Sequence, residues 1–422
     1  MTLPDDATLP PAAPALLGRF GPAAWAILDQ AFFAGANFLM NVLLARWLGA
    51  DAYGALAVGL ATLFLLGAMH MALLGEPLLV FGAGRFAERR GAYLAAILAG
   101  HWAVSGVVLV AMVVAGALFA MGESRELAVA LIGLGLASPF ILLQWLTRRI
   151  CYLTRQPHAA ALAGAAYLAL MLGGLVALRQ GGWVSLPSAL VVMGAASAVT
   201  GLALVLLIRP GWSSLDRLLL REAASAHAGY GRWSMATNAA IFSSGQAFYL
   251  LAAMLISLEA SALLRAMMNL VTPMHLVSAA AATLLVPALV RAPTPEAVRS
   301  RTRAVLALLC AAAAGYWLIL GLAQGPLFEI VYGGQYRPRG ALVWILGATL
   351  VTGAASDVAA AALRARERPD LVFAAFAGAA VFALAGGTAL ILLLGMTGTV
   401  LSMAISGAAG AAGLAIFLSR RR

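Results

Sequence analysis

The 422-residue chain contains no lysine, only two cysteines, and charged side chains at just 10% of its positions. A soluble chain of this length needs more surface charge than that to stay dispersed in water. Hydrophobic residues, by contrast, make up 63% of the sequence. The shortage of charge therefore excludes an ordinary soluble protein and indicates a chain that lies mostly within a lipid bilayer.

The sequence also lacks the motifs of soluble catalysis and of metal binding. It contains no phosphate-binding GxxxxGK[ST], no GxSxG and no HExxH. Cys151 and Cys310 have no metal-site spacing and are expected to be free thiols. His70, His101 and His275 lack the helical spacing of a metal pair, so they are expected to be packing or cavity histidines. We therefore expect no cofactor, no metal and no enzymatic activity.

Long hydrophobic runs are abundant. A helix needs about 20 residues, at a rise of 1.5 Å each, to cross the hydrocarbon core of a bilayer. The sequence contains about twelve such runs. The predicted spans are 23–45, 54–83, 92–119, 126–147, 158–178, 187–208, 234–258, 266–290, 304–323, 341–363, 371–394 and 398–418.

The distribution of the arginines orients these spans. Of the 27 arginines, 21 lie in the two termini and in every second gap between the runs. The other six are Arg46, Arg125, Arg179, Arg265, Arg337 and Arg339. By the positive-inside rule this pattern predicts a bacterial inner-membrane protein with both termini in the cytoplasm. The net charge of +11 then reflects topology and attraction to anionic bilayer lipids, and it requires no nucleic-acid partner.

Two polar segments divide the chain. Residues 1–16, rich in proline and bearing two aspartates, are predicted to be a disordered cytoplasmic tail rather than a secretory signal. The longest polar interruption, 209–233, is predicted to be a short amphipathic helix at the cytoplasmic interface. It separates an N-lobe of six spans, 17–208, from a C-lobe of six spans, 234–422.

The two halves resemble each other weakly. At an offset of 210 residues Gly35 matches Gly245 and Pro77 matches Pro287, and both prolines fall late in the second span of their half. Duplicated six-span halves are typical of secondary transporters, in which the halves rock about a central site. The sequence therefore predicts an all-α integral membrane protein with about twelve transmembrane helices, arranged in two six-helix lobes with a pseudo-two-fold repeat.

Three carboxylates fall within the predicted spans: Asp29, Glu76 and Asp357. A charge at the centre of a membrane helix costs about 2.5–3.5 kcal/mol on insertion scales, so each one requires a compensating role. All three fall in the predicted cytoplasmic half of the bilayer. They either line an inward-facing polar cavity, where they pair with cations or bind H⁺ or Na⁺, or make structural hydrogen bonds between helices.

Polar residues also mark the first span of each half. Gln30, Asn37 and Asn41 lie on one side of the span-1 helix. Span 7 begins with a polar stretch that includes Asn238 and Gln246. We therefore predict that spans 1 and 7, with their neighbours 2 and 8, line a central cavity. The alternative is that these side chains bind only neighbouring helices.

Two arginines are candidates for binding a phosphate group, because the planar guanidinium meets phosphate oxygens bidentately. Arg46 and Arg265 lie on the arginine-poor side, where orientation alone gives no reason to keep them. The alternative is that both reach into the lipid headgroups. Further span-end candidates are Arg85, Arg148, Arg149 and Arg232.

Several junctions resemble those of a known family. Residues 45–54 (ARWLGADAYG) resemble the R-x-L-G-x-x-x-Y-G junction between the first two helices of bacterial polysaccharide flippases. These proteins belong to the multidrug/oligosaccharidyl-lipid/polysaccharide exporter (MOP) superfamily. Residues 76–85 (EPLLVFGAGR) are similar to the end of the second helix in a branch of the family, and residues 327–336 and 363–369 are similar to its second half.

The resemblance implies a fold like that of the multidrug-extruding MATE members. It also implies alternating-access transport of an undecaprenyl-pyrophosphate-linked oligosaccharide to the outer leaflet, for O-antigen or exopolysaccharide export. A polysaccharide polymerase and glycosyltransferases are then the expected partners. Lipid II flippases carry an arginine about five residues before the proline of helix eight and two extra helices. This chain has Met268 there, before Pro273, and no length for the extra helices, which argues against lipid II.

Other functions remain open from the sequence. A cation-coupled multidrug antiporter of the same superfamily has the same twelve-span plan. A membrane polysaccharide polymerase or glycosyltransferase needs a sizeable outside loop with catalytic residues, and the longest predicted one, 324–340, leaves no room for a domain. A non-transporting scaffold is disfavoured by the polar first spans.

Overall fold

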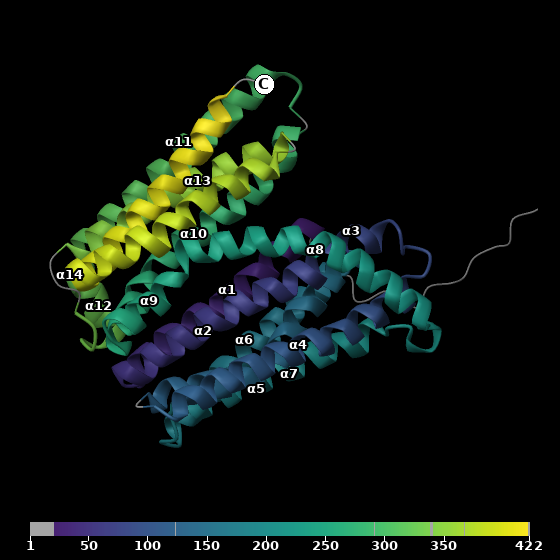
Figure 1. Cartoon of the computed structure of the whole chain (residues 1–422), viewed down its shortest axis with the longest axis horizontal. Helices are drawn as coiled ribbons and strands as arrows, with labels where there is room; N and C mark the ends of the chain where they lie inside the picture. Colours follow the sequence, from purple (N-terminus) through teal and green to yellow (C-terminus); the bar gives the residue numbers. More distant parts are fainter. Residues whose placement is uncertain (1–20, 123, 291, 338–340, 367, 421–422) are drawn as a thin grey trace, which may run out of the picture.

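The computed structural model describes residues 21–122, 124–290, 292–337, 341–366 and 368–420. The predicted tail, 1–16, lies outside the described residues. The described part is almost entirely helical and contains no strand. Its helices form two bundles, one from each half of the chain (Figure 1).

The first lobe contains six membrane-spanning stretches. Its elements are α1 (Pro22–Trp47), α2 (Ala50–His70), η2 (Met71–Gly75), α3 (Glu76–Ala83), α4 (Arg90–Ala120), α5 (Arg125–Leu153), α6 (Pro157–Gln180) and α7 (Leu186–Ile208). The π-helical turn η2 lies between α2 and α3, and the three elements together form one apolar span. All six spans match the predicted ones, with the largest difference at the end of the fourth, which was predicted at 147 and lies at Leu153.

The second half begins with a short 3-10 turn and contains eight elements. They are η3 (Trp212–Ser214), α8 (Arg217–Gly245), α9 (Ala247–Leu255), α10 (Leu258–Val290), α11 (Pro295–Leu322), α12 (Gln324–Tyr332), α13 (Leu342–Ala365) and α14 (Pro369–Ser419). The described residues of the predicted 324–340 loop contain a short helix, α12. Helices α8 and α9 together form one span that bends by 48° at Gln246.

Helix α14 is really two helices. Gly395 lies within it at φ 55°, ψ −130°, a backbone conformation that glycine adopts without the steric cost other residues meet. The two legs lie against each other, since the Ser402 hydroxyl donates to the Gly387 carbonyl and the Ser406 hydroxyl to the Ala379 carbonyl. Nine helices of the described part are long and apolar enough to cross a membrane, or ten with the bent α8–α9 pair. Counting the two legs of α14 separately and adding the 33-residue α10 gives the number of helices that the twelve predicted spans require.

The internal repeat is visible in the packing. Helix α2 packs on α5 in the first lobe as α10 packs on α13 in the second. Likewise α4 packs on α5 as α11 packs on α13, and α5 packs on α7 as α13 packs on α14. The duplication predicted from the sequence is therefore confirmed at the level of the fold.

Small residues allow these helices to approach closely. A Cβ atom at Gly194 of α7 would lie 3.1 Å from the Cβ of Ala137 on α5, and one at Gly133 would lie 2.6 Å from Leu190. Such contacts are typical of membrane helices, which associate by packing rather than by burial from water. Large apolar side chains instead cover the outer faces: Leu118 and Leu393, for example, are exposed in the isolated chain and suit contact with lipid.

The linker differs from its prediction. Residues 217–233 are not a separate short helix, because α8 runs without a break from Arg217 to Gly245. Asp216 caps its start by accepting a hydrogen bond from the Leu219 amide at 2.6 Å. The predicted boundary at 233/234 thus falls inside a helix. The amphipathic segment is helical, as predicted. Because the membrane span that follows is also a helix with the same period, the two join into one helix.

The two ends of the molecule differ in charge. We call the end where α3, α13 and α14 finish and α4, α8 and α11 begin the arginine-rich end. The opposite end, where α1 finishes, α2 and α10 begin and α12 lies, is the arginine-poor end. In Figure 1 the two lobes converge near α9 and α12 and diverge towards the arginine-rich end.

Candidate functional site

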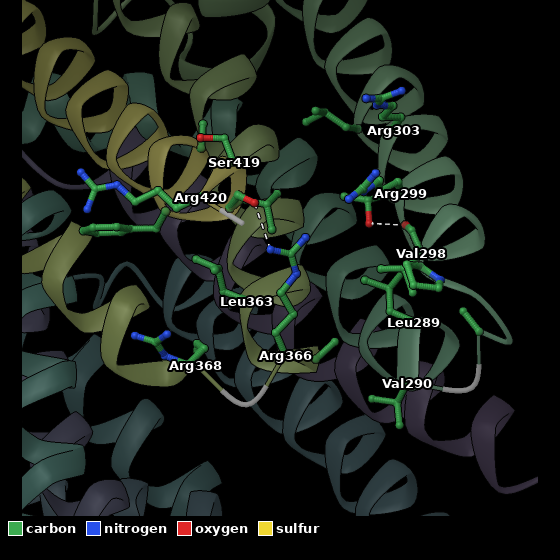
Figure 2. A pocket seen from close by; sticks show the side chains of 18 of the residues that line it. Leu289, Val290, Val298, Arg299, Arg303, Leu363, Arg366, Arg368, Ser419 and Arg420 are labelled. Atoms are coloured by element: carbon green, nitrogen blue, oxygen red, sulfur yellow. Dashed lines mark hydrogen bonds between the residues drawn. The ribbon is translucent and has the colours of Figure 1, made fainter. Parts of the chain in front are cut away.

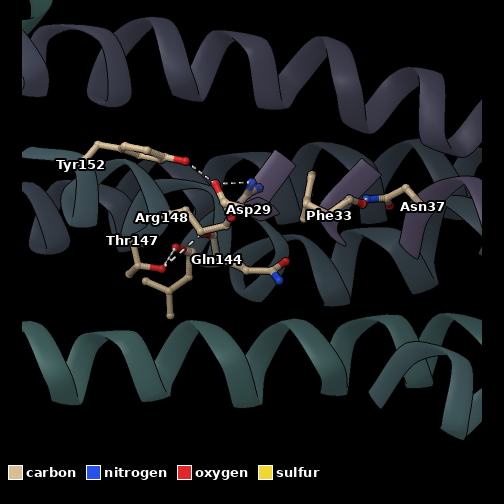
Figure 3. Close-up of polar contacts among 8 residues, drawn as sticks. Asp29, Phe33, Asn37, Gln144, Thr147, Arg148 and Tyr152 are labelled. Atoms are coloured by element: carbon tan, nitrogen blue, oxygen red, sulfur yellow. Dashed lines mark hydrogen bonds and ion pairs between the residues drawn. The ribbon is translucent and has the colours of Figure 1, made fainter. Parts of the chain in front are cut away.

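The carboxylate of Asp29 forms a buried ion pair within the first lobe (Figure 3). Its two oxygens accept hydrogen bonds from Nε and Nη2 of Arg148 on α5, both at 2.8 Å. The hydroxyl of Tyr152 donates a third at 2.6 Å. Asp29 is fully buried, and the Arg148 guanidinium also stacks 4.0 Å from the ring centroid of Phe33.

This geometry accounts for both charges inside the membrane. A bidentate arginine–carboxylate pair has the directional hydrogen bonds that offset part of the desolvation cost of two buried ions. Arg148, a sequence candidate for phosphate binding, is therefore committed to Asp29. In this conformation Asp29 is likewise a partner of Arg148 and not a free anion facing a cavity.

The second intramembrane acid, Glu76, lies beside an irregular turn. Pro77 has no amide hydrogen to donate to the carbonyl of Leu73, four residues earlier, and a regular α-helix cannot accommodate it there. The chain forms the π-helical turn η2 just before it. The freed Leu73 carbonyl instead accepts a hydrogen bond from Nδ1 of His227, at 2.8 Å, which comes from α8.

The remaining nitrogen of His227 is also satisfied. Because the Leu73 carbonyl can only accept, Nδ1 carries the proton, so Nε2 accepts from the Tyr93 hydroxyl at 2.7 Å. A Cβ atom at Gly231, one turn further along α8, would lie 3.1 Å from the Ala72 carbonyl oxygen. The beginning of α8 is thus held tightly against the irregular turn of the second span.

Two further residues on the same face of α8 reach Glu76. The Ser234 hydroxyl donates to Oε2 of Glu76, and Nδ2 of Asn238 lies 3.4 Å from Oε1. Two of the predicted site residues, Glu76 and Asn238, are therefore neighbours. Among the described residues no arginine lies within ion-pairing distance of Glu76. Its assignment to the binding of H⁺ or Na⁺ stays a prediction.

Arg265 lies between the lobes near the arginine-poor end. Its Nε donates to Oδ1 of Asn41 on α1 at 3.1 Å, which joins two more of the predicted residues. Its guanidinium lies 5.3 Å from the ring centroid of Tyr249 and 5.9 Å from that of Phe64. Among the described residues no carboxylate pairs with it. Arg265 is thus a partly buried cation that is stabilised by aromatic faces and by one amide.

Other contacts between the lobes cluster around Arg265. They are Arg46 Nη1 to the Ile330 carbonyl (3.5 Å), Gln335 Nε2 to the Leu48 carbonyl (2.6 Å) and Asn269 Nδ2 to the Tyr53 hydroxyl (2.9 Å). A Cβ atom at Gly54 would overlap the Leu258 carbonyl, so only glycine permits this close approach. We call these residues, with Asn41 and Arg265, the interlobe contact zone.

The other predicted residues lie apart from one another. Gln30 is exposed, and Asn37 donates to the carbonyl of Phe33 in its own helix at 2.8 Å. Gln246 lies at the bend between α8 and α9, with its Oε1 buried and without a partner among the described residues. Asp357 is half-buried on α13. The assignment of these residues to substrate binding stays a prediction.

Two histidines come together in a way that the spacing did not reveal. His70 Nε2 and His101 Nδ1 lie 2.9 Å apart, between the second and third spans, and both side chains are fully buried. Their other ring nitrogens have no partner among the described residues. No group of three metal-ligating side chains occurs in the described part of the chain.

The fold itself is shared with solved membrane transporters. No protein-family model and no curated protein matches the chain in sequence. A multidrug resistance MATE family transporter of the MOP superfamily, solved facing inward, superposes with a TM-score of 0.72 at 12% identity, covering 93% of this chain and 98% of that one. The chain has the fold of MOP-superfamily transporters.

Two further structures refine the comparison. The lipid II flippase MurJ, in an inward closed conformation, gives a TM-score of 0.72 at 12% identity, covering 94% of this chain and 87% of its own. An outward-facing MATE family transporter gives 0.65 at 13% identity, covering 96% and 98%. The predicted MATE-like architecture is thus confirmed at the level of the fold.

Proposed function

We propose that this protein is an alternating-access transporter that moves an undecaprenyl-pyrophosphate-linked oligosaccharide from the inner to the outer leaflet of a bacterial inner membrane. The choice of substrate rests on one observation: the buried acid Asp29 has a cationic partner, but the partly buried Arg265 has no anionic one among the described residues. Asp29 is neutralised by Arg148, whereas Arg265 has no carboxylate partner in the described part of the chain. A partly buried, uncompensated cation favours an anionic substrate over a cationic one.

The aromatic surroundings of Arg265 favour the same substrate class. Tyr249 and Phe64 place aromatic rings 5.3 Å and 5.9 Å from the guanidinium, whose charge no carboxylate in the described part of the chain neutralises. A pyrophosphate offers several oxygens for a bidentate contact. In this proposal the polyprenyl tail stays in the bilayer. Phosphate recognition at Arg265 is thus consistent with a lipid-linked glycan.

The arrangement of the lobes supports alternating access. Apart from those of α8, which binds the first lobe through Glu222, His227, Ser234 and Asn238, the polar contacts described above between the lobes lie in the interlobe contact zone at the arginine-poor end, while the lobes diverge at the other end (Figure 1). The positive-inside rule assigns the arginine-rich end to the cytoplasm. In this proposal the structure represents an inward-facing state, and transport requires the contact zone to separate.

A cellular experiment tests the proposed activity. Lipid-linked oligosaccharide should accumulate in the inner leaflet of a strain that lacks this protein, as detected by leaflet-resolved labelling. Restored export by the full chain completes the test. Normal distribution of the lipid-linked oligosaccharide between leaflets in the deletion strain would exclude the proposed substrate.

A binding experiment tests the role of Arg265. The Arg265→Ala variant should bind undecaprenyl pyrophosphate at least tenfold more weakly, since a hydrogen bond to a charged group contributes about 1.5–3 kcal/mol. Arg337→Ala is the matched control, because Arg337 lies at the same end but is 80% exposed and contacts Glu329 at 3.8 Å. Equal affinities of the two purified variants would remove Arg265 from the substrate site.

A cation-coupled multidrug antiporter is the second candidate. The observation that favours it is Asp357, a half-buried acid on α13 with no arginine at ion-pairing distance among the described residues. Similarity of fold to a multidrug resistance transporter is equally compatible with this function. Efflux of cationic dyes by cells that express the protein, with no effect on lipid-linked oligosaccharide, would favour the antiporter.

A further inference from the structure

A basic cavity opens at the arginine-rich end of the second lobe (Figure 2). Its volume is about 1160 Å³, and it lies among the ends of α10, α13 and α14 and the beginning of α11. None of the ten residues predicted from the sequence lines it. The cavity is therefore distinct from the interlobe contact zone, which lies at the opposite end of the molecule.

The lining combines cations with an apolar wall. The arginines that line the cavity are Arg299, Arg303, Arg366, Arg368 and Arg420. The apolar lining side chains include Leu289, Val298, Leu306, Leu363, Leu371 and Phe417. No aspartate or glutamate is among the lining residues. A ligand that fills the cavity must therefore carry both negative charge and apolar surface.

Most of these cations have no counter-charge. Arg368 pairs with Asp370 at 2.8 Å, and Arg366 donates to the Leu418 carbonyl at 2.9 Å. Arg299 and Arg303 are one turn apart on α11 and so share a face, and no carboxylate in the described part of the chain pairs with either. The positive N-terminal end of the 28-residue α11 opens on the same cavity.

The equivalent surface of the first lobe is covered by a segment of the chain itself. At the corresponding ends of α3, α4, α5 and α7, the linker and the start of α8 cover the bundle, where Leu215, Leu219 and Ala223 join a hydrophobic cluster. Glu222 meanwhile pairs with Arg85 at 2.7 Å and Arg89 at 3.3 Å. The occupant of the first lobe thus brings a carboxylate to an arginine pair and leucines to the apolar wall.

We propose that the cavity of the second lobe binds an anionic bilayer phospholipid, with its phosphate on Arg299, Arg303 and Arg366 and the upper part of an acyl chain against Leu289 and Leu371. The lipid supplies in the second lobe the two components that Glu222 and the leucines supply in the first. Basic pockets between helices on the cytoplasmic face are suited to such headgroups. A free phosphate would satisfy the arginines but leave the apolar wall exposed to water.

The test measures retention of phosphatidylglycerol by the purified, delipidated full chain, using native mass spectrometry. The double variant Arg299→Gln/Arg303→Gln should retain at least fivefold less phosphatidylglycerol than the unchanged protein. The control Arg217→Gln/Arg221→Gln removes the same charge at the arginine-rich end, from exposed positions on α8, and should change retention by less than about twofold. Phosphatidylcholine, which is zwitterionic, should be retained weakly by all three.

Two further measurements distinguish a bound lipid from free phosphate and provide a second variant in case the first does not fold. Inorganic phosphate at millimolar concentration should not displace the lipid, because it cannot cover the apolar wall; displacement would show an anion site and overturn the lipid assignment. Equal loss in the two double variants would show only general surface charge and would also overturn it. If Arg299→Gln/Arg303→Gln fails to fold, Arg366→Gln is the second variant, and unchanged retention by Arg366→Gln contradicts the proposed phosphate contact.

Discussion

At the scale of single residues, the charges buried in the membrane are not equivalent. Asp29 is fully buried and receives three charge-assisted or hydroxyl hydrogen bonds, whereas Glu76 has only neutral polar partners within reach. Arg265 has an amide and two aromatic faces but no acid among the described residues. Asp29 is therefore the group whose loss should affect stability most, because it would leave Arg148 charged and desolvated.

The Asp29→Asn variant tests this role. Removing one partner of a buried ion pair typically destabilises a protein by about 3–5 kcal/mol, so a marked fall in melting temperature in detergent is expected. Asp370→Asn is the matched control: Asp370 also binds an arginine through two nitrogens, but the pair is exposed and little change is expected. A melting temperature that is the same for both variants would contradict a stabilising role for the Asp29–Arg148 pair.

The pairing of these residues could not be predicted from the sequence. Asp29 and Arg148 are 119 positions apart, and each fits more than one environment when read alone. The sequence identified Asp29 as an intramembrane charge that needs a partner, and this was sufficient to single it out. The sequence analysis also placed Arg148 among the candidates for phosphate binding. The contact between Arg148 and Asp29 is tertiary, and a tertiary contact produces no periodic pattern in the sequence.

At the scale of elements, the irregular turn in the second span links the two halves. Pro77 forces a carbonyl out of the helix, and His227 from α8 donates to it. Pro77 is evident in the sequence, but the sequence gives no sign of the partner of the freed carbonyl, because His227 lies in a polar segment 154 positions from Leu73. Turns of this π-helical kind are frequent at functional sites. The contact therefore joins the linker to the span that carries Glu76.

This contact should weaken in acid. His227 precedes the apolar part of α8, which begins at Ser234. Burial lowers the pKa of His227 from 6.5, and its hydrogen bond to the Leu73 carbonyl opposes part of that shift. The docked helix thus binds fewer protons than the undocked one, so docking loses stability as the pH falls below about 6.5, by at most about 1.4 kcal/mol per pH unit.

Hydrogen–deuterium exchange of residues 218–231 measures the effect. After correction for intrinsic exchange, protection should decrease between about pH 7.5 and about pH 5.5, the range in which a histidine titrates. The His227→Asn variant provides the control, because the asparagine amide keeps a donor for Leu73 but does not titrate. A pH dependence that persists in His227→Asn would assign the effect to another group.

Helix boundaries were predicted best where backbone chemistry marks them. The predicted gap between 394 and 398 contains Gly395, whose positive φ reverses the chain between two apolar legs. The apolar part of α8 begins at Ser234, where span 7 was predicted to begin, but the helix itself continues from Arg217 to Gly245 without a break. Amphipathic and transmembrane helices share one period, and polarity alone does not end a helix.

At the scale of the whole molecule, the twelve predicted spans followed from hydrophobic runs, and their duplication from matched positions such as Pro77 and Pro287. The structure brings residues 292–303 and 363–371 to a single cavity, as their common assignment to one side of the membrane requires. The relative position of the lobes was not predictable, because it depends on a few side chains such as Arg46, Asn41 and Gln335. These contacts must break if the second lobe moves.

The motion of the lobes can be measured directly by electron–electron resonance between spin labels, in a variant whose two native cysteines are replaced. One pair of labels, at Arg149 and Arg364, reports on the arginine-rich end; the other, at the exposed Met121 and Leu322, reports on the arginine-poor end. Added undecaprenyl pyrophosphate should shorten the first distance and lengthen the second. Distances that stay fixed, or that change in the same direction at both ends, would contradict alternating access.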